Sequence, residues 1–333
     1  MKHANVAVFV PHLGCTHRCS FCSQKNITGQ ENIPSPQEAA EIFRNGIAAL
    51  GRRAKTAQIA FYGGSFTAIP KELRIPLLEA AQPFLGERGY SGIRIATRPD
   101  AIGNEILSEL KSYGVTAIEL GAQSMDDDVL AANNRGHTAD DTAAASRLIK
   151  KHGFSLGHHM MTGLYGSDPE KDIMTAEKLI ALGPDTMRIH PALAVEGTEL
   201  ARLYREGLYK PQSLDEAVKL CAKLLQMFHK AKIDVIRAGL HDTQSLGQSV
   251  VAGPYHPAFR ELCEGVIMLD AALGLLRDIP PGNISPAVHP SFVSRMAGQN
   301  KCNTRKLQEM GYNVKIKRDD TLSPFEIKLK GVY

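Results

Sequence analysis

Short apolar runs alternate with longer helical stretches along the first 240 residues of this chain. The runs rich in Val, Ile and Phe predict strands at 6–11, 57–62, 92–97, 115–120, 154–161, 185–190 and 233–237. The stretches between them predict helices at 36–50, 71–85, 103–113, 139–151, 168–182 and 213–231. Because strand–helix–strand repetition requires parallel strands with right-handed crossovers, we predict an α/β fold with a partial, TIM-like (β/α)6 barrel.

The chain changes character after the segment RDIPPGNISP at 277–286, whose Pro, Gly and Asn residues indicate a boundary. A short helix near 302–309 and strand-like runs at 312–317 and 325–329 follow it. We therefore expect a partial barrel over 1–240, a helical extension over 241–283 and a small, basic α+β C-terminal domain over 284–333.

Composition excludes several classes of protein. The 333 residues are 22% charged and 43% hydrophobic, as in an ordinary soluble chain. There is no run of about 18 apolar residues, so no membrane span is expected, and the N-terminal apolar run lacks the cleavage site of a signal peptide. Six cysteines, three of them clustered, are too few for a disulfide scaffold and favour a metal or redox site in a reducing cytoplasm.

Positive charge is concentrated near the C-terminus. From residue 284 onward nine basic residues stand against four acids, while the whole chain carries only +4. The nine are Arg295, Lys301, Arg305, Lys306, Lys315, Lys317, Arg318, Lys328 and Lys330. Such a positive field attracts phosphate-rich partners, among them tRNA or other RNA. A solubilising surface would have the same composition, and the sequence leaves both interpretations open.

Three cysteines lie within eight positions of the segment GCTHRCSFCSQ at 14–24, directly after the first predicted strand. Barrel enzymes gather their chemistry at the carboxyl ends of strands, which is where this loop lies. Thiolates suit zinc, copper(I) or iron–sulfur clusters. The three cysteines could bind three irons of a cluster and leave the fourth open. A zinc site would need a further ligand, for which His12 and His17 are candidates.

More polar segments begin at the ends of the following predicted strands. They are FYGGSFT at 61–67, ATRPD at 96–100, IELGAQSMDDDVLAANNRGHTADD at 118–141, GHHMMTGLYG at 157–166 and RIHPALAVEGTELARLYREGLYKP at 188–211. Any one of them could be an ordinary loop, but the set predicts a site at one edge of the sheet. The adjacent histidines of GHHMM are expected on opposite faces of their strand, so they do not form a metal pair.

The spacing Cys15-x3-Cys19-x2-Cys22, with Phe21 before the last cysteine, resembles the radical S-adenosylmethionine (radical SAM) superfamily. The resemblance implies a [4Fe–4S] cluster on the three cysteines, with S-adenosylmethionine chelating the open iron. It also implies reductive cleavage to a 5′-deoxyadenosyl radical, with an electron from a donor such as flavodoxin or ferredoxin. The cofactors carry this chemistry, and the protein supplies position and excludes water.

Gly63 and Gly64 have no Cβ, so a ligand can approach their backbone closely, although a tight turn would have the same sequence. With Ser65 they resemble the Gly-Gly motif of the radical SAM superfamily. The resemblance implies that backbone atoms of this motif bind the amino group of S-adenosylmethionine.

The later segments resemble, in order, the radical SAM domain of the Elongator catalytic-subunit family, which modifies wobble uridine in tRNA. This resemblance covers roughly residues 5–240, and Arg98 belongs to its TRPD segment. The chain is also similar, less closely, to anaerobic coproporphyrinogen oxidases. Gln123, Arg135 and His159 fall where those oxidases contact S-adenosylmethionine, with His159 in place of an aspartate.

The chain departs from the Elongator family in two respects, so the radical chemistry is better supported than the substrate. That family has a much longer gap between its first two cysteines, and it continues into an acetyltransferase domain that we do not expect here. We therefore expect a radical SAM enzyme, with RNA, first of all tRNA, as the substrate. An enzyme acting on a small molecule or peptide is the second hypothesis, and a non-enzymatic zinc-binding module is the third. Cys221, Cys263 and Cys302 are expected to be structural.

Overall fold

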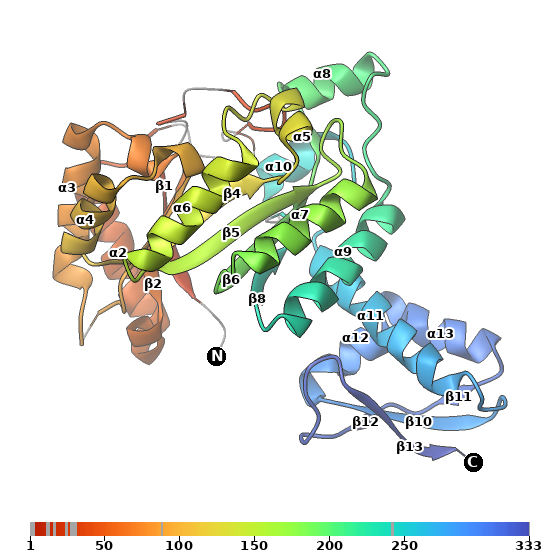
Figure 1. The fold of residues 1–333 in the computed structure, drawn as a ribbon. Helices are drawn as coiled ribbons and strands as arrows, with labels where there is room; N and C mark the ends of the chain where they lie inside the picture. The colour runs from red at the N-terminus through yellow and green to blue at the C-terminus, as the bar shows by residue number, and fades with distance from the viewer. Residues whose placement is uncertain are drawn as a thin grey trace. The chain divides into compact units, whose positions relative to one another are not determined.

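A parallel sheet of seven strands forms the centre of the larger part of the molecule (Figure 1). The computed structural model describes residues 4–10, 14–15, 18–23, 26, 32–87, 89–240 and 243–332. The strands are β1 (Asn5–Val10), β2 (Gln58–Gly63), β3 (Ile93–Thr97), β4 (Val115–Gln123), β5 (Ser155–Thr162), β6 (Thr186–Pro191) and β8 (Asp234–Ala238), adjacent in that order. The predicted α/β fold and all seven predicted strands are confirmed.

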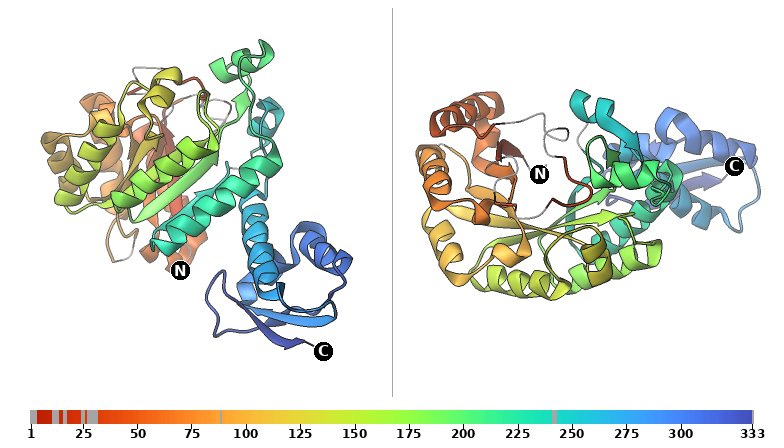
Figure 2. Two further views of the ribbon diagram at one scale, coloured as in Figure 1. Left: turned by 45° about the vertical axis from the view of Figure 1, so that its right-hand side comes forward. Right: turned by 90° about the horizontal axis from the view of Figure 1, so that it is seen from above.

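Helices follow the outside of the curled sheet, so the architecture is the predicted partial barrel (Figure 2). The longer ones are α2 (Pro36–Leu50), α3 (Lys71–Ala81), α4 (Asn104–Ser112), α6 (Ala139–Lys151) and α7 (Pro169–Ala181). Shorter helices are α5 (Asp127–Ala132), α8 (Glu199–Arg205) and α10 (Gln244–Ser249). Short segments of 3-10 helix occupy Gly51–Thr56, Phe66–Ala68, Gln82–Phe84 and Pro99–Ala101. The short strands β7 (Ala194–Val195) and β9 (Val250–Ala252) pair with each other.

Local sequence explains where the helices begin. At α2 the hydroxyl of Ser35 accepts a hydrogen bond from the backbone of Glu38, whose carboxylate accepts one from the backbone of Ser35. This reciprocal capping box satisfies two of the backbone donors that the first turn leaves without helical partners. Thr138 and Asp141 form the same arrangement at α6.

The outer face of the sheet is apolar and packs against the helices. Alternate side chains of β1 to β5 belong to one buried core, including Val8, Ile59, Phe61, Ile95 and Leu120. The alternate residues point to the inner face, and several of them are polar or charged. Because successive side chains of a strand point to opposite faces, the same strands form both the apolar outer face and the polar inner face.

A second compact unit comprises residues 213–227 and 256–333, and the larger unit holds the rest of the chain. The second unit contains α9 (Leu214–Lys230, up to residue 227), α11 (Phe259–Leu276), α12 (Val293–Ala297), α13 (Cys302–Glu309), and 3-10 turns at Pro290–Phe292 and Gln299–Lys301. Its sheet has β10 (Asn283–Val288) between β13 (Ile327–Val332) on one side and both β11 (Asn313–Val314) and β12 (Lys317–Arg318) on the other. This is the expected small α+β extension, with a core of its own.

The expected boundary segment has a structural role. Residues 283–286 of RDIPPGNISP belong to β10, with which all three other strands of the small sheet pair. The domain division at residues 240 and 283 stays a prediction, since the two compact units group the chain by contacts instead. No described helix is both long and apolar enough to span a membrane.

Candidate active site

The three-cysteine loop follows β1 and is anchored on both sides by Ser20, which is buried. The amide of Ser20 donates to the carbonyl of Asn133 at 3.1 Å, and its hydroxyl donates to the side chain of Asn133 at 2.6 Å. The amide of Leu200 donates to the carbonyl of Ser20 at 2.8 Å. Next to this anchor, the amide of Cys22 donates to the carbonyl of Cys19 at 3.1 Å, which places these two cysteines on one turn.

Gly14 lets the start of the loop pack against the segment after β2. Its φ is +73°, and a Cβ at this position would lie 2.4 Å from the carbonyl oxygen of Ser65. No side chain fits there, so glycine is required on both grounds. The thiol of Cys15 lies 3.7 Å from the hydroxyl of Ser65. Ser65 is thus in contact with the first cysteine.

The Gly-Gly segment lies at the end of β1 as well. The amide of Gly64 donates to the carbonyl of Val10 at 2.8 Å. A Cβ on Gly63, whose φ is +109°, would lie 3.1 Å from the same carbonyl oxygen. The close approach of the two strand ends explains Gly63, and it places the segment beside the cysteine loop.

Arg135 connects β4 to the second cysteine. One terminal nitrogen donates to the Cys19 sulfur at 3.4 Å, and the other donates to the carbonyl of Gly121 at 2.7 Å. A Cβ on Gly121 would lie 2.7 Å from the Arg135 guanidinium and 3.0 Å from the amide nitrogen of Gln123. Glycine at 121 therefore leaves the space that both side chains occupy.

Gln123 ends β4 in an unusual conformation. Its φ is +65°, in the left-handed region that residues other than glycine rarely adopt, and its side chain is buried. Its amide oxygen and the Nε of Arg135 are buried and make no hydrogen bond to a described residue. Buried polar atoms normally have partners, so these two atoms mark a place where a polar ligand would fit.

Two other predicted site residues have structural contacts. The guanidinium of Arg98 donates to both oxygens of Asp100, at 2.5 and 2.6 Å, and lies 3.5 Å from the carbonyl of Gly136. Phe21 packs against an apolar cluster that includes Met161, and helps to hold the loop. Their roles in cofactor binding stay predictions.

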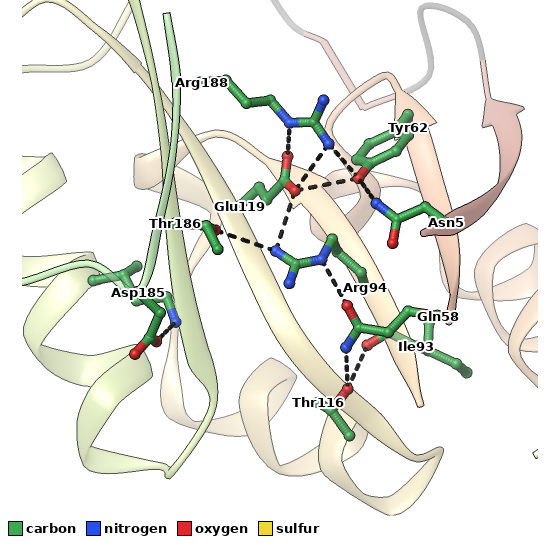
Figure 3. Close-up of polar contacts among 11 residues, drawn as sticks. Asn5, Gln58, Tyr62, Ile93, Arg94, Thr116, Glu119, Asp185, Thr186 and Arg188 are labelled. Carbon is green, nitrogen blue, oxygen red and sulfur yellow. Dashed lines mark hydrogen bonds and ion pairs between the residues drawn. The ribbon is translucent and has the colours of Figure 1, made fainter. Parts of the chain in front are cut away.

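A buried ion network lies on the inner face of the sheet (Figure 3). The carboxylate of Glu119 accepts hydrogen bonds from Arg188, at 2.7 and 3.2 Å, and from Arg94 at 3.1 Å. The hydroxyl of Tyr62 donates to the same carboxylate at 3.2 Å and accepts from Arg188 at 2.7 Å. Gln58 accepts from Arg94 at 2.9 Å. Asn5 of β1 also donates to the Tyr62 hydroxyl at 2.9 Å, so five strands contribute to one network.

Charge pairing keeps this network ionised. Burial alone would raise the pKa of Glu119, but Arg188 and Arg94 outweigh burial and hold that pKa below its ordinary value. Burial and the carboxylate of Glu119 raise the pKa of Tyr62, so its phenol stays protonated. With two guanidiniums and one carboxylate, the network has a net charge of about +1.

The adjacent histidines face opposite sides of β5, as predicted. His158 lies in the outer core, where its Nε2 is 2.8 Å from the hydroxyl of Ser146. His159 faces the inner side, where its ring stacks edge-on with His190 at 4.2 Å between centroids. Burial, followed by the positive charge of Arg188, lowers the pKa of His159 to about 3, so the imidazole is neutral.

Sequence reasoning singled out neither the ion network nor His190. A signal was present in the sequence, because Arg94, Glu119 and Arg188 are charged residues in the middle of mainly apolar strands. A charged side chain in such a position must be paired if it is buried. Its partners could not be read from the sequence.

The donor set suits an iron–sulfur cluster. All three cysteines of the loop are free thiols. Within the described ranges, no three His, Cys, Asp or Glu side chains converge on a single metal ion. The corners of a cluster spread its ligands more widely than one ion does, and three thiolates on one loop fit it in donor type and number. His12 and His17, the candidate zinc ligands, lie outside the described residues.

Comparison with known families decides the class. Residues 9–179 match the radical SAM superfamily, and residues 184–267 match the radical SAM C-terminal domain. The chain belongs to the radical SAM superfamily. It is therefore an enzyme, and a [4Fe–4S] cluster and S-adenosylmethionine are its cofactors, as predicted from the cysteine spacing.

Curated relatives of this radical SAM chain come from the Elongator group. It is 36% identical over 148 residues to the tRNA uridine(34) acetyltransferase of Methanocaldococcus jannaschii, a match that covers 43% of this chain and 27% of the relative. It is 32% identical over 198 residues to human Elongator complex protein 3, covering 54% of this chain and 36% of the relative. The chain thus spans well under half of the length of either relative.

Solved structures confirm the fold. The archaeal Elp3 of Methanocaldococcus infernus, with its N-terminus deleted, superposes with a TM-score of 0.63 at 21% sequence identity. The match covers 80% of this chain and 62% of the other. The partial barrel of this radical SAM enzyme is therefore shared with that protein.

Proposed function

We propose that this radical SAM enzyme cleaves S-adenosylmethionine reductively at a [4Fe–4S] cluster and modifies tRNA. The observation that carries the first part is the contact of Cys19 with Arg135, which joins the three-cysteine loop to the carboxyl end of β4. When bound, the cluster and S-adenosylmethionine supply the one-electron cleavage chemistry. An electron donor such as flavodoxin or ferredoxin would supply the electron.

The chain's own residues position the reactants. Cys15, Cys19 and Cys22 would hold three irons and leave one for S-adenosylmethionine. The guanidinium of Arg135 donates to the Cys19 sulfur, and hydrogen bonds to ligand sulfurs are one means of setting a cluster's reduction potential. The buried amide oxygen of Gln123 offers an acceptor to the bound S-adenosylmethionine.

The substrate part of the proposal draws on charge as well as on the names of the relatives. Six basic residues of the C-terminal unit are exposed and make no ion pair with any described residue, namely Lys301, Arg305, Lys306, Lys315, Lys317 and Arg318. By contrast, Lys330 pairs with Asp319 at 2.7 Å and Lys328 with Glu326 at 3.3 Å. The unpaired set is available to the phosphates of RNA.

Replacement of a cluster ligand tests the chemistry. Cys19→Ala should abolish both labile sulfide and the release of 5′-deoxyadenosine by reductant, because two thiolates do not hold a catalytic cluster. Cys302→Ala is the control, since Cys302 is a free, exposed cysteine of the other unit. Iron, sulfide and zinc are measured on anaerobically purified protein. Persistent 5′-deoxyadenosine in Cys19→Ala, or zinc without sulfide in the wild type, would refute the assignment.

Salt dependence of binding tests the substrate. Neutralising Lys315, Lys317 and Arg318 should weaken tRNA binding by about tenfold or more at low salt and flatten its salt dependence, because each phosphate contact releases counterions. The matched control neutralises Arg52, Arg53 and Lys55, three exposed basic residues of the larger unit. Undetectable tRNA binding at low salt would instead favour a small-molecule or peptide substrate.

A further inference from the structure

The inner face of the sheet keeps buried polar and charged groups close together. Gly157 on β5 shows that room is kept for them. A Cβ there would lie 2.8 Å from both the Glu119 side chain and the Thr186 hydroxyl, and 3.6 Å from the guanidinium of Arg94. Replacing a buried ion network with well-packed apolar residues is often neutral or stabilising in proteins, so a buried network is weak evidence of a role in stability.

Two donor groups on the inner face make no hydrogen bond to a described residue. Nη1 of Arg188 makes no hydrogen bond or ion pair with a residue in the described part of the chain, and Figure 3 shows it on the side of the guanidinium away from Glu119. The Nε2 of His159 is buried and likewise has no partner among the described residues. Guanidinium nitrogens are donors only, so the Nη1 of Arg188 can donate to the acceptor of a bound ligand.

These two groups lie in one row of the sheet, next to the cysteine site. His159 is the register partner of Arg188 on β6 and of Gly121 on β4. The carbonyl of Gly121 is the group that Arg135 binds while it contacts Cys19. One side of the row therefore adjoins the cluster loop and the other side adjoins the buried network.

We propose that Arg188 and His159 bind an oxyanion of the substrate, a carboxylate or a phosphate group, on the inner face of the sheet. Arg188 donates from Nη1, His159 donates from the Nε2–H tautomer, and Arg94 and Arg188 together outweigh Glu119 in charge. This assignment deepens the proposed function and rests on it in one respect, namely that the occupant of the inner face is the substrate. Binding of the anion itself needs neither electron nor S-adenosylmethionine.

Two charge-changing variants should shift the affinity for the anion in opposite directions. Arg188→Gln removes the donor and one positive charge, so affinity for the anion should fall by about tenfold or more. Glu119→Gln removes the internal counter-charge, so affinity should rise by roughly threefold to tenfold. Arg295→Gln is the control, because Arg295 also pairs with a buried carboxylate, Glu264, at 3.0 Å, but in the other unit. A purely structural network predicts lower stability in both inner-face variants and no opposite trend in affinity.

The cluster-loaded protein is titrated with acetate and, separately, with phosphate, at ionic strength matched with chloride. Binding is read as the saturable rise in melting temperature, without S-adenosylmethionine or reductant. Phosphate stabilises proteins non-specifically, so the difference in shift between the control Arg295→Gln and Arg188→Gln isolates the contribution of the site. A response to acetate but not phosphate identifies a carboxylate, and the reverse identifies a phosphate.

Three outcomes would overturn the proposal. They are no saturable shift in the wild type, an equal shift in Arg188→Gln and the wild type, and a weaker shift in Glu119→Gln. If Arg188→Gln does not fold, the rise expected for Glu119→Gln still decides the matter. A parallel measurement of KM for S-adenosylmethionine tells whether the anion belongs to the substrate or to the cofactor. If Arg188→Gln changed only this KM, the site would bind the cofactor's own carboxylate, and the proposal would be wrong. Loss of 5′-deoxyadenosine release with intact anion binding would count against the proposed function and not against this site.

Discussion

Phe61 and Tyr62 are neighbours on β2 and face opposite sides of the same sheet. Phe61 is fully buried, stacks on Phe66 with 4.8 Å between ring centroids, and meets Phe43 edge-on. The Tyr62 hydroxyl joins Glu119 and Arg188 in the ion network. The outer face thus contributes apolar packing, while the inner face holds charges that pair with one another. The two faces of one sheet therefore differ in kind: apolar packing on the outer face and paired charges on the inner face.

Truncation at the two neighbours should give the largest contrast. Phe61→Ala should lower the free energy of unfolding by about 3–5 kcal/mol, because it loses apolar burial and leaves a cavity. Tyr62→Phe should cost only about 1–2 kcal/mol, since it removes one hydroxyl while Arg188 and Glu119 keep each other. Urea unfolding of both variants measures this. Equal losses would break the distinction between the faces.

The two histidines of β5 provide a smaller, pH-dependent contrast. Burial lowers the pKa of both His158 and His159 to about 3, so both stay neutral in the folded chain. The unfolded chain takes up these protons below about pH 6.5, so stability is fully present above that pH and falls as the pH is lowered toward 3. Each histidine should contribute a loss of about 1.4 kcal/mol per pH unit. Denaturation between pH 6.5 and 5 measures the slope, which His158→Asn and His159→Asn should each reduce.

A second variant distinguishes the causes on the two faces. Arg188 lowers the pKa of His159, whereas Lys150 is the charged neighbour that lowers the pKa of His158. In Arg188→Gln the pKa of His159 should therefore rise while that of His158 stays the same. NMR titration of the two imidazoles reads this directly. A parallel rise at both would mean that the faces share one environment.

Much of the fold follows from local sequence patterns. The alternation of apolar runs and helical stretches predicted every strand of the large sheet, because a strand buried on one face needs branched apolar residues at every second position. Ser35 and Pro36 marked the first residue of α2, because capping chemistry acts within one turn. The three-cysteine loop was also visible, since its ligands are adjacent in the chain.

The arrangement around the cysteines depended on residues far apart in sequence. Gly14 could not be interpreted without the carbonyl of Ser65 against which it packs. The same holds for Gly121, whose missing side chain accommodates Arg135. A glycine's neighbour is set by tertiary packing, and a single sequence does not contain it.

The sequence by itself determined the order of strands and helices, the spacing of the three clustered cysteines and the excess of basic residues in the last fifty positions. These are properties of short segments, and local propensity and spacing decide them. Only the tertiary structure decided that Tyr62, Arg94, Glu119 and Arg188 meet on the inner face. Their meeting depends on the register of the five strands β2 to β6, and a shift of one residue in any of the strands that carry them would turn its side chain to the other face.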